Sequence, residues 1–248
     1  MRSASESQSA EHITVANFQL ATALLTLFTP DEEISAAKIV TGLLPKWEKF
    51  FDGEPVVLPQ AAGWPREVPR LVLRNKEGTW RCEVSSARMN IVWDSSNTEQ
   101  TQTAADVVKT ATPYFNEYCD FVRCRTGRLA AVINRYCVVP SPGLFLARHF
   151  CQPRWLKAPL NRPESFELHA HKRYAFPTGD DVNSWVRNKT ALLTVDSKPI
   201  VLVEQDLNTL AENVATKAFS SAEVERFFLT AVSEFDNILA LYYPPSDA

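Results

Sequence analysis

The order of hydrophobic patterns along the chain constrains its fold more than any other feature of the sequence. A strand-type run from Ile13 to Leu25 precedes helix-type spacing after Ser35, then two strand-type runs and a second helix-type run from Thr103. The same order returns between Leu129 and Tyr242 with one extra strand. Because a helix with one apolar stripe buries that stripe against a sheet, we predict an α+β protein. Two similar β-α-β-β-α halves are expected to form antiparallel sheet covered by helices.

This order leaves two other interpretations open. The run from Ile13 to Leu25 also fits an amphipathic helix, and unrelated elements that merely alternate would give the same order. A chain of 248 residues is long enough for one large domain or two small ones, each with a hydrophobic core. The prediction divides it into a disordered tail at 1–12, a first α+β half at 13–124 and a second at 125–248.

Capping residues and prolines mark where the predicted helices begin and bend. Ser35 is an expected N-cap, Thr103 with Asp106 has the spacing of a helix start, and Ser220 opens the last helical run. Pro45 is expected to kink the first helix, because proline lacks the N–H that donates to the preceding turn.

Turn-forming residues at Asn75–Gly78 separate a short apolar run, Leu71–Leu73, from a longer run that opens at Thr79. The two runs are predicted to form a β-hairpin. Within the longer run the apolar residues change parity, which predicts a β-bulge near Ser85 and Ser86.

The composition, with 45% hydrophobic and 22% charged residues, is that of a folded globular chain. Five cysteines are an odd number without close spacing, which favours free buried thiols over a disulfide framework. The N-terminal residues show no apolar signal segment, and the most apolar early stretch is too polar for a membrane span. We therefore expect a cytoplasmic protein with no membrane partner.

Short motifs in this layout resemble those of a known family. They are the hairpin arm Pro69–Leu73, the strand end Asp206–Asn208 and the Phe227–Phe228 pair in the terminal helix. Together with the element order they resemble a sporadically distributed bacterial family of uncharacterised proteins of about this length. The resemblance covers nearly the whole chain and implies a bacterial origin, but no activity or site residue. A second resemblance is to SecB-like chaperones that accompany toxin–antitoxin pairs, although no motif carries it.

Signatures of common catalytic and cofactor sites are absent from the sequence. There is no glycine-rich phosphate loop, no G-x-S-x-G elbow, no H-E-x-x-H and no paired C-x-x-C. Only seven of the 248 residues are glycine, which disfavours backbone cradles for nucleotides. We favour a protein that is not an enzyme and holds no cofactor.

Polar residues on one parity of a predicted strand form the strongest metal-like pattern. Glu167, His169 and His171 alternate with apolar neighbours and are expected on one exposed side. Two imidazoles and a carboxylate can ligate zinc and leave a position for water, which makes a metal-assisted hydrolase the second alternative function. Ordinary solvated sheet residues are the favoured interpretation, so no metal is predicted. Glu204 and Asp206, a weaker acid–base candidate, are expected where their strand leaves the core.

A basic segment is the most distinctive chemical feature of the chain. Residues 121–163 contain eight Lys and Arg residues and no Asp or Glu. The binding residues predicted there are Arg123, Arg125, Arg128, Arg135, Arg148, Arg154 and Trp155. Guanidinium groups beside aromatic rings suit phosphate contact and base stacking, so nucleic-acid or phosphate binding through segment 123–162 is the first alternative function. Residues 204–248 carry eight acidic and two basic residues, and internal pairing with them is the favoured interpretation.

Our leading hypothesis is a non-catalytic protein-interaction module, as an accessory or neutralising component of a bacterial defence or toxin–antitoxin system. Trp64, Trp155 and Trp185 fall in predicted loops or strand starts, where exposed aromatic side chains anchor protein partners. Burial of all three would remove this support. The working surface is expected on the second half or at the junction of the halves, while the partner and the oligomeric state remain open.

Overall fold

The computed structural model describes residues 13–30, 35–59, 63–98 and 100–245, and the predicted tail at 1–12 lies outside them. Within the described residues, nine strands form one antiparallel sheet in the order β2-β3-β4-β5-β1-β6-β9-β8-β7. The strands are β1 Gln19–Phe28, β2 Val56–Val57, β3 Leu71–Arg74, β4 Trp80–Val84, β5 Arg88–Asp94, β6 Arg128–Val138, β7 Glu167–Ala175, β8 Asp181–Leu192 and β9 Pro199–Thr209. The α-helices are α1 Ala36–Gly42, α2 Leu44–Trp47, α3 Ala104–Val122, α4 Pro142–Phe150 and α5 Ser221–Tyr242. The α+β class is therefore confirmed.

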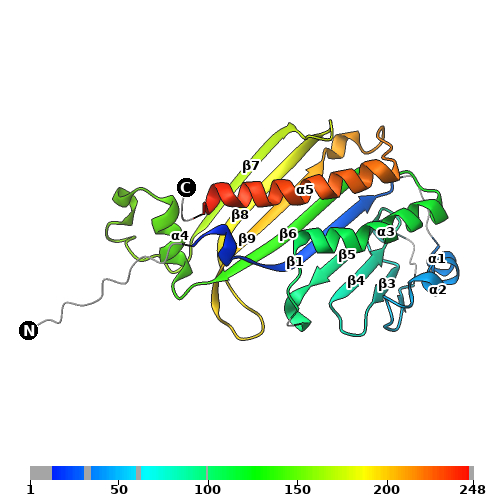
Figure 1. Ribbon diagram of the computed structural model, residues 1–248, viewed down its shortest axis with the longest axis horizontal. Coiled ribbons are helices and arrows are strands. Elements are labelled where there is room, and N and C mark those ends of the chain that lie inside the picture. Colours follow the sequence, from blue (N-terminus) through cyan, green and yellow to red (C-terminus); the bar gives the residue numbers. More distant parts are fainter. Residues whose placement is uncertain (1–12, 31–34, 60–62, 99, 246–248) are drawn as a thin grey trace, which may run out of the picture.

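The two long helices, α3 and α5, lie across the same face of the sheet (Figure 1). Side chains alternate along each strand, so in β6 Leu129 and Ile133 are buried beneath the helices. Ala130 and Val132 point to the opposite face and are only partly buried. We call this opposite side the open face. None of the helices in the described part of the chain combines the length and apolar character that a membrane crossing requires.

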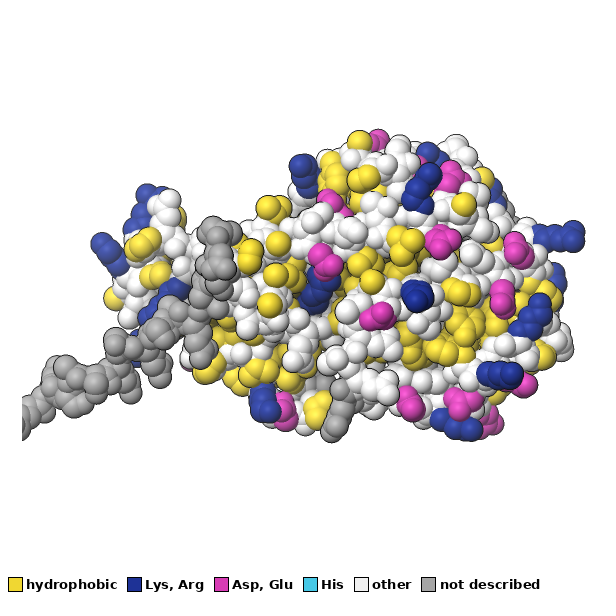
Figure 2. Space-filling view, in the orientation of Figure 1, with side chains coloured by type: hydrophobic (Ala, Val, Ile, Leu, Met, Phe, Trp, Pro, Cys, Tyr) yellow, Lys and Arg dark blue, Asp and Glu magenta, His cyan; other side chains and the backbone are white. Residues whose placement is uncertain are grey.

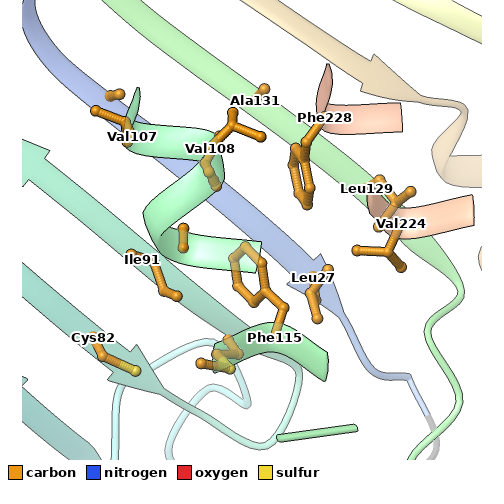
Figure 3. Close-up of a cluster of buried hydrophobic side chains, with 14 of the residues drawn as sticks. Leu27, Cys82, Ile91, Val107, Val108, Phe115, Leu129, Ala131, Val224 and Phe228 are labelled. Atoms are coloured by element: carbon orange, nitrogen blue, oxygen red, sulfur yellow. The ribbon is translucent and has the colours of Figure 1, made fainter. Parts of the chain in front are cut away.

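The main hydrophobic core fills the space between the sheet and the two long helices (Figure 3). Phe115 of α3 and Phe228 of α5 stack across the helix seam, with ring centroids 5.4 Å apart and planes 19° apart. A second cluster forms where the end of α5 meets α4, and its buried members include Leu146, Val203 and Tyr243. The sheet thus has one core under the long helices and another at the α4 end.

The structure corrects two local predictions. The first strand begins at Gln19 rather than Ile13, because Val15–Asn17 forms a 3-10 turn closed by hydrogen bonds between Thr14 and the side chain of Asn17. The predicted bulge near Ser85 and Ser86 is wrong. Those residues form a tight turn between β4 and β5, in which the Ser85 hydroxyl accepts hydrogen bonds from the backbone N–H groups at positions 87 and 88.

Other local predictions are confirmed. Ser35 caps α1, and the helix is interrupted ahead of Pro45, so that α1 and α2 are separate. β3 and β4 pair as the expected hairpin. Thr103 and Asp106 form a capping box at the start of α3, and α3 continues through Pro113.

The N-terminus of α5 provides a test of local stabilisation. The Ser220 hydroxyl accepts from the Glu223 N–H, and the Glu223 carboxylate accepts from the Ser220 N–H at 2.8 Å. Replacing Ser220 with alanine leaves a helix N–H without its acceptor, and we expect the free energy of unfolding to fall by about 1 kcal/mol. Chemical denaturation of the two proteins measures the difference. An unchanged midpoint would show that water replaces this cap without loss.

Candidate interaction surface

The first three predicted binding residues lie between the end of α3 and the start of β6. Arg123 is the exposed C-cap of α3 and adopts a left-handed conformation with φ of 56°. Arg125 donates through Nη1 to the carbonyl oxygens of Val214 and Lys217, at 2.9 and 2.6 Å. Arg128 reaches the open face and donates to backbone and side-chain oxygens at the end of β9. Arg125 and Arg128 therefore hold the fold together at this end.

Arg135 lies on the helix face of β6 and is buried. Its guanidinium donates to Gln205 Oε1 at 2.9 Å and forms a very short contact with Asp236 of α5. Burial lowers the pKa of Arg135, and the Asp236 carboxylate offsets part of that shift. This is internal pairing of the basic segment with the acidic C-terminal region, and it removes Arg135 from any external surface.

Arg148, Arg154 and Trp155 lie beyond the other end of β6. An eleven-residue strand spans about 35 Å, so these residues are far from the Arg123–Arg128 group. The structure thus divides the seven predicted residues among two ends of the molecule and its interior. It does not bring them together into one binding surface.

Residues 152–165, which connect α4 to β7, form a projecting lobe (Figure 1). Trp155 and Leu160 in this lobe are 62% and 69% exposed. The Arg154 guanidinium carbon lies 5.5 Å from the centroid of the Trp155 ring. Lys157 and Arg162 are also exposed, so that apolar and basic groups share this surface (Figure 2). Leu160 had no distinguishing signal in the sequence, because a leucine between prolines suits a buried turn as well as an exposed one.

The base of the lobe rests directly on α4. A Cβ atom at Gly143 would lie 2.5 Å from the carbonyl oxygens of Pro163 and Glu164, so only glycine permits this approach. The rings of Phe150 and Phe166, which flank the lobe, stack with centroids 6.5 Å apart. The two ends of the lobe are therefore anchored while its tip is exposed.

A histidine joins α4 to the end of α5. The His149 ring is stacked against Phe145 on α4 and against Tyr243, with centroid distances of 5.7 and 5.0 Å. His149 Nε2 lies 2.6 Å from the carbonyl oxygen of Tyr242, so this nitrogen carries the proton and donates it. These contacts fix the position of α4, the helix against which the base of the lobe packs.

The three candidate tryptophans differ in exposure. Trp155 is the most exposed, Trp64 is 48% exposed and Trp185 is partly buried. On the open face, the rings of Trp185 and His171 stack with centroids 4.1 Å apart, and the Arg187 guanidinium carbon lies 5.2 Å from the centroid of the Trp185 ring. Because the three tryptophans are not all buried, they still support the hypothesis of a protein-interaction module.

Polar groups of the open face are paired with one another across strands. The Thr26 hydroxyl donates to Asn90 Oδ1 at 2.9 Å, and Asn134 Nδ2 donates to the Thr22 hydroxyl at 2.8 Å. Glu204 lies in the middle of β9 and pairs with Arg187 and Lys189, so the expectation that it leaves the core with the strand end is wrong. The Glu204 carboxylate is thus engaged by two cations of β8.

The side chains of Glu167, His169 and His171 do not meet at a common position. His169 Nε2 is 3.2 Å from a Glu167 carboxylate oxygen, whereas His171 Nε2 is 3.3 Å from Asn183 Oδ1 and stacks on Trp185. Among the described residues no group of three His, Cys, Asp or Glu side chains is arranged to hold a metal ion. The arrangement gives the metal-assisted hydrolase no support.

None of the five cysteines is in a disulfide bond, and Cys82 and Cys137 are buried. Cys119 lies close to Cys124, and the hydrogen bond from that thiol lowers the pKa of Cys119 to about 7 against the opposing effect of burial. Both thiols adjoin the main core, as expected from the sequence.

A cavity of about 460 Å³ lies between the start of α3 and the second half of α5. Its apolar lining includes Phe18, Leu20 and Val232, and its charged lining consists of the Arg135–Asp236 pair. Because these two charges offset each other, the cavity offers a ligand no net charge.

Comparison with known proteins does not assign the chain to a family. No family model matches the sequence, and no curated protein matches it. A solved structure, the di-domain ARO/CYC StfQ from the steffimycin biosynthetic pathway, is similar at 11% sequence identity with a TM-score of 0.19. The match covers 90% of this chain and 97% of that chain. A likeness with so low a TM-score supports no conclusion about fold or function.

Proposed function

We propose that this protein is a non-catalytic protein-interaction module that binds its partner through the projecting lobe. The observation that carries the proposal is the exposure of Trp155 and Leu160 among basic side chains on an anchored segment. Tryptophan contributes more to interface affinity than most residues, and an exposed apolar pair on a fixed base loses little conformational entropy on binding. The expected partner presents an apolar pocket with acidic residues around it.

The broader setting stays a prediction. The sequence-based hypothesis places the module in a bacterial defence or toxin–antitoxin system, within the bacterial family that the chain resembles. The exposed Trp155 and Leu160 of the lobe are compatible with a neutralising role for this chain. We retain this setting as a proposal, to be tested by identifying the partner.

The duplicated organisation is also a proposal. The strands β3-β4-β5-β1 on one side of the sheet are mirrored by β7-β8-β9-β6 on the other. Each set is followed in the chain by a long helix, α3 or α5. This arrangement supports two similar halves that meet between α3 and β6, near the predicted boundary at 124/125.

Affinity capture from an extract of the source organism tests the lobe. We expect the full-length protein to retain a specific protein, and Trp155→Ala with Leu160→Ala to weaken that binding by about 2 kcal/mol or more. Trp64→Ala is the matched control, since it removes another exposed tryptophan outside the lobe. A partner that the lobe variant retains as well as the unmodified protein does would refute the proposal.

Nucleic-acid binding is the second candidate, because a guanidinium over an exposed tryptophan ring is also a base-stacking arrangement. Nuclease treatment separates the two functions. Loss of capture after nuclease treatment, together with a steep loss of affinity with added salt, would favour nucleic acid over a protein partner. Binding that resists nuclease is the result expected for the lead proposal.

A further inference from the structure

β7 forms one edge of the nine-stranded sheet. It runs for nine residues without proline, and its regular register with β8 extends from Glu167 to Ala175. Within the described residues its only strand neighbour is β8. An edge of this length presents a row of backbone donors and acceptors that can pair with another chain.

The hydrogen bonds at both ends of β7 determine which residues present those groups. The Thr190 N–H donates to the Phe166 carbonyl at 3.3 Å, and the Phe176 N–H donates to the Asp180 carbonyl at 2.7 Å. In an antiparallel pair, residues that bond to the partner strand through their backbone alternate with residues that do not. Since Phe166 and Phe176 bond toward β8, the even-numbered residues of β7 direct their backbone N–H and C=O groups toward β8. The odd-numbered residues therefore direct their N–H and C=O groups outward. They are Glu167, His169, His171, Arg173 and Ala175.

We propose that β7 pairs antiparallel with β7 of a second copy of the chain, about a two-fold axis at Ala170. In this register Glu167 lies opposite Arg173 of the second copy, and His169 lies opposite His171. All four are outward-bonding positions, so the pairing would form about eight main-chain hydrogen bonds. Two sheets would join into one continuous sheet.

Side-chain charge selects this register. Opposite charges directly across an antiparallel pair are stabilising, and the two-fold axis creates the Glu167–Arg173 pair twice. Both side chains are more than half exposed, and Arg173 already contacts Glu212 at 3.0 Å, so it would lie between two carboxylates. An axis shifted by one residue to His171 would place Arg173 opposite His169 and leave Glu167 opposite Ala175.

Side-chain size agrees with the same axis. Ala170 would meet Ala170 of the second copy at a non-bonded position, where side chains approach most closely and a small residue fits. Leu241 of α5 is 81% exposed, the highest value among the large hydrophobic residues of the described chain. Leu241 and Ala170 line the same groove of about 340 Å³ beside β7. Pairing at Ala170 would bring the two copies of Leu241 toward each other over the axis and remove apolar surface from water.

Analytical ultracentrifugation of the full-length protein over a concentration series tests this pairing. A reversible dimer of the 27.9 kDa chain is expected. Glu167→Arg or Arg173→Glu alone places like charges opposite each other and should raise the dimer dissociation constant about tenfold or more. The double variant exchanges the two charges and should restore dimerisation.

Two further variants test whether dimerisation depends on the backbone of β7 and not on ion pairs elsewhere in the chain. His169→Pro removes one outward N–H while leaving the bonds to β8 intact, so the chain should fold but no longer dimerise. Exchanging Asp52 and Lys76, an exposed ion pair in the first half, should leave dimerisation unchanged. A monomeric unmodified protein, or a dimer that persists in both single charge variants, would overturn the proposal. A double variant that stays monomeric would overturn the assigned register.

Discussion

Phe228→Ala is expected to lower the free energy of unfolding by about 3–5 kcal/mol, because it opens a cavity where α3, α5 and the sheet meet. The Phe228 side chain is fully buried and stacks on Phe115, and both rings lie in the centre of the main core (Figure 3). Urea denaturation of the purified proteins measures the loss. Leu229→Ala is the matched control, because this neighbour on α5 is 48% exposed and its truncation should cost less than about 1 kcal/mol.

The contact between the two rings can be measured separately. Phe115→Ala is expected to cost a similar amount, and the double variant should cost less than the sum of the two by about 1 kcal/mol. Strict additivity would mean that the rings do not interact, and it would contradict the close packing of α3 against α5.

Asp236→Ala is expected to cost about 3 kcal/mol, because it leaves the buried Arg135 guanidinium without its only carboxylate in the described structure. The carboxylate itself is largely exposed, so its own removal from α5 is harmless. The penalty arises from an uncompensated charge inside the protein. Thermal or urea denaturation at neutral pH gives the difference.

The background in which Arg135 is replaced by methionine supplies the control. Once the guanidinium is gone, Asp236→Ala should change stability by less than about 0.5 kcal/mol, as for an ordinary surface residue. Equal losses in the two backgrounds would show that the ion pair does not stabilise the fold and that the side chain of Asp236 acts in another way.

Local signals predicted most of the elements. The capping boxes at Thr103 and Ser220 and the hairpin turn at Asn75–Gly78 are decided by neighbouring residues, and the structure contains each of them. The parity change at Ser85 was ambiguous, because a bulge and a tight turn both reverse the facing of side chains. Only the pairing of β4 with β5 distinguishes them.

The sequence predicts the burial of some basic residues but not the exposure of others. Arg135 and Arg154 look alike in a charge count, yet one is buried against α5 and the other projects from the lobe. Strand parity places Arg135 on the same side as Ile133, which is the signal that would have identified it as internal. The predicted loop position of Trp155 favours exposure, whereas no signal places Leu160 outside, because its exposure depends on how 152–165 passes over Gly143.

If the lobe is the binding surface, a bound partner covers residues 152–165. Hydrogen–deuterium exchange of the full-length protein, alone and with the captured partner, tests it most directly. Because the tip of the lobe is exposed, its backbone N–H groups should exchange rapidly in the free protein. We expect the partner to slow exchange within 152–165 and to leave exchange in β3, β4 and β5 unchanged. Unaltered exchange in the lobe, with slowing elsewhere in the chain, would contradict it.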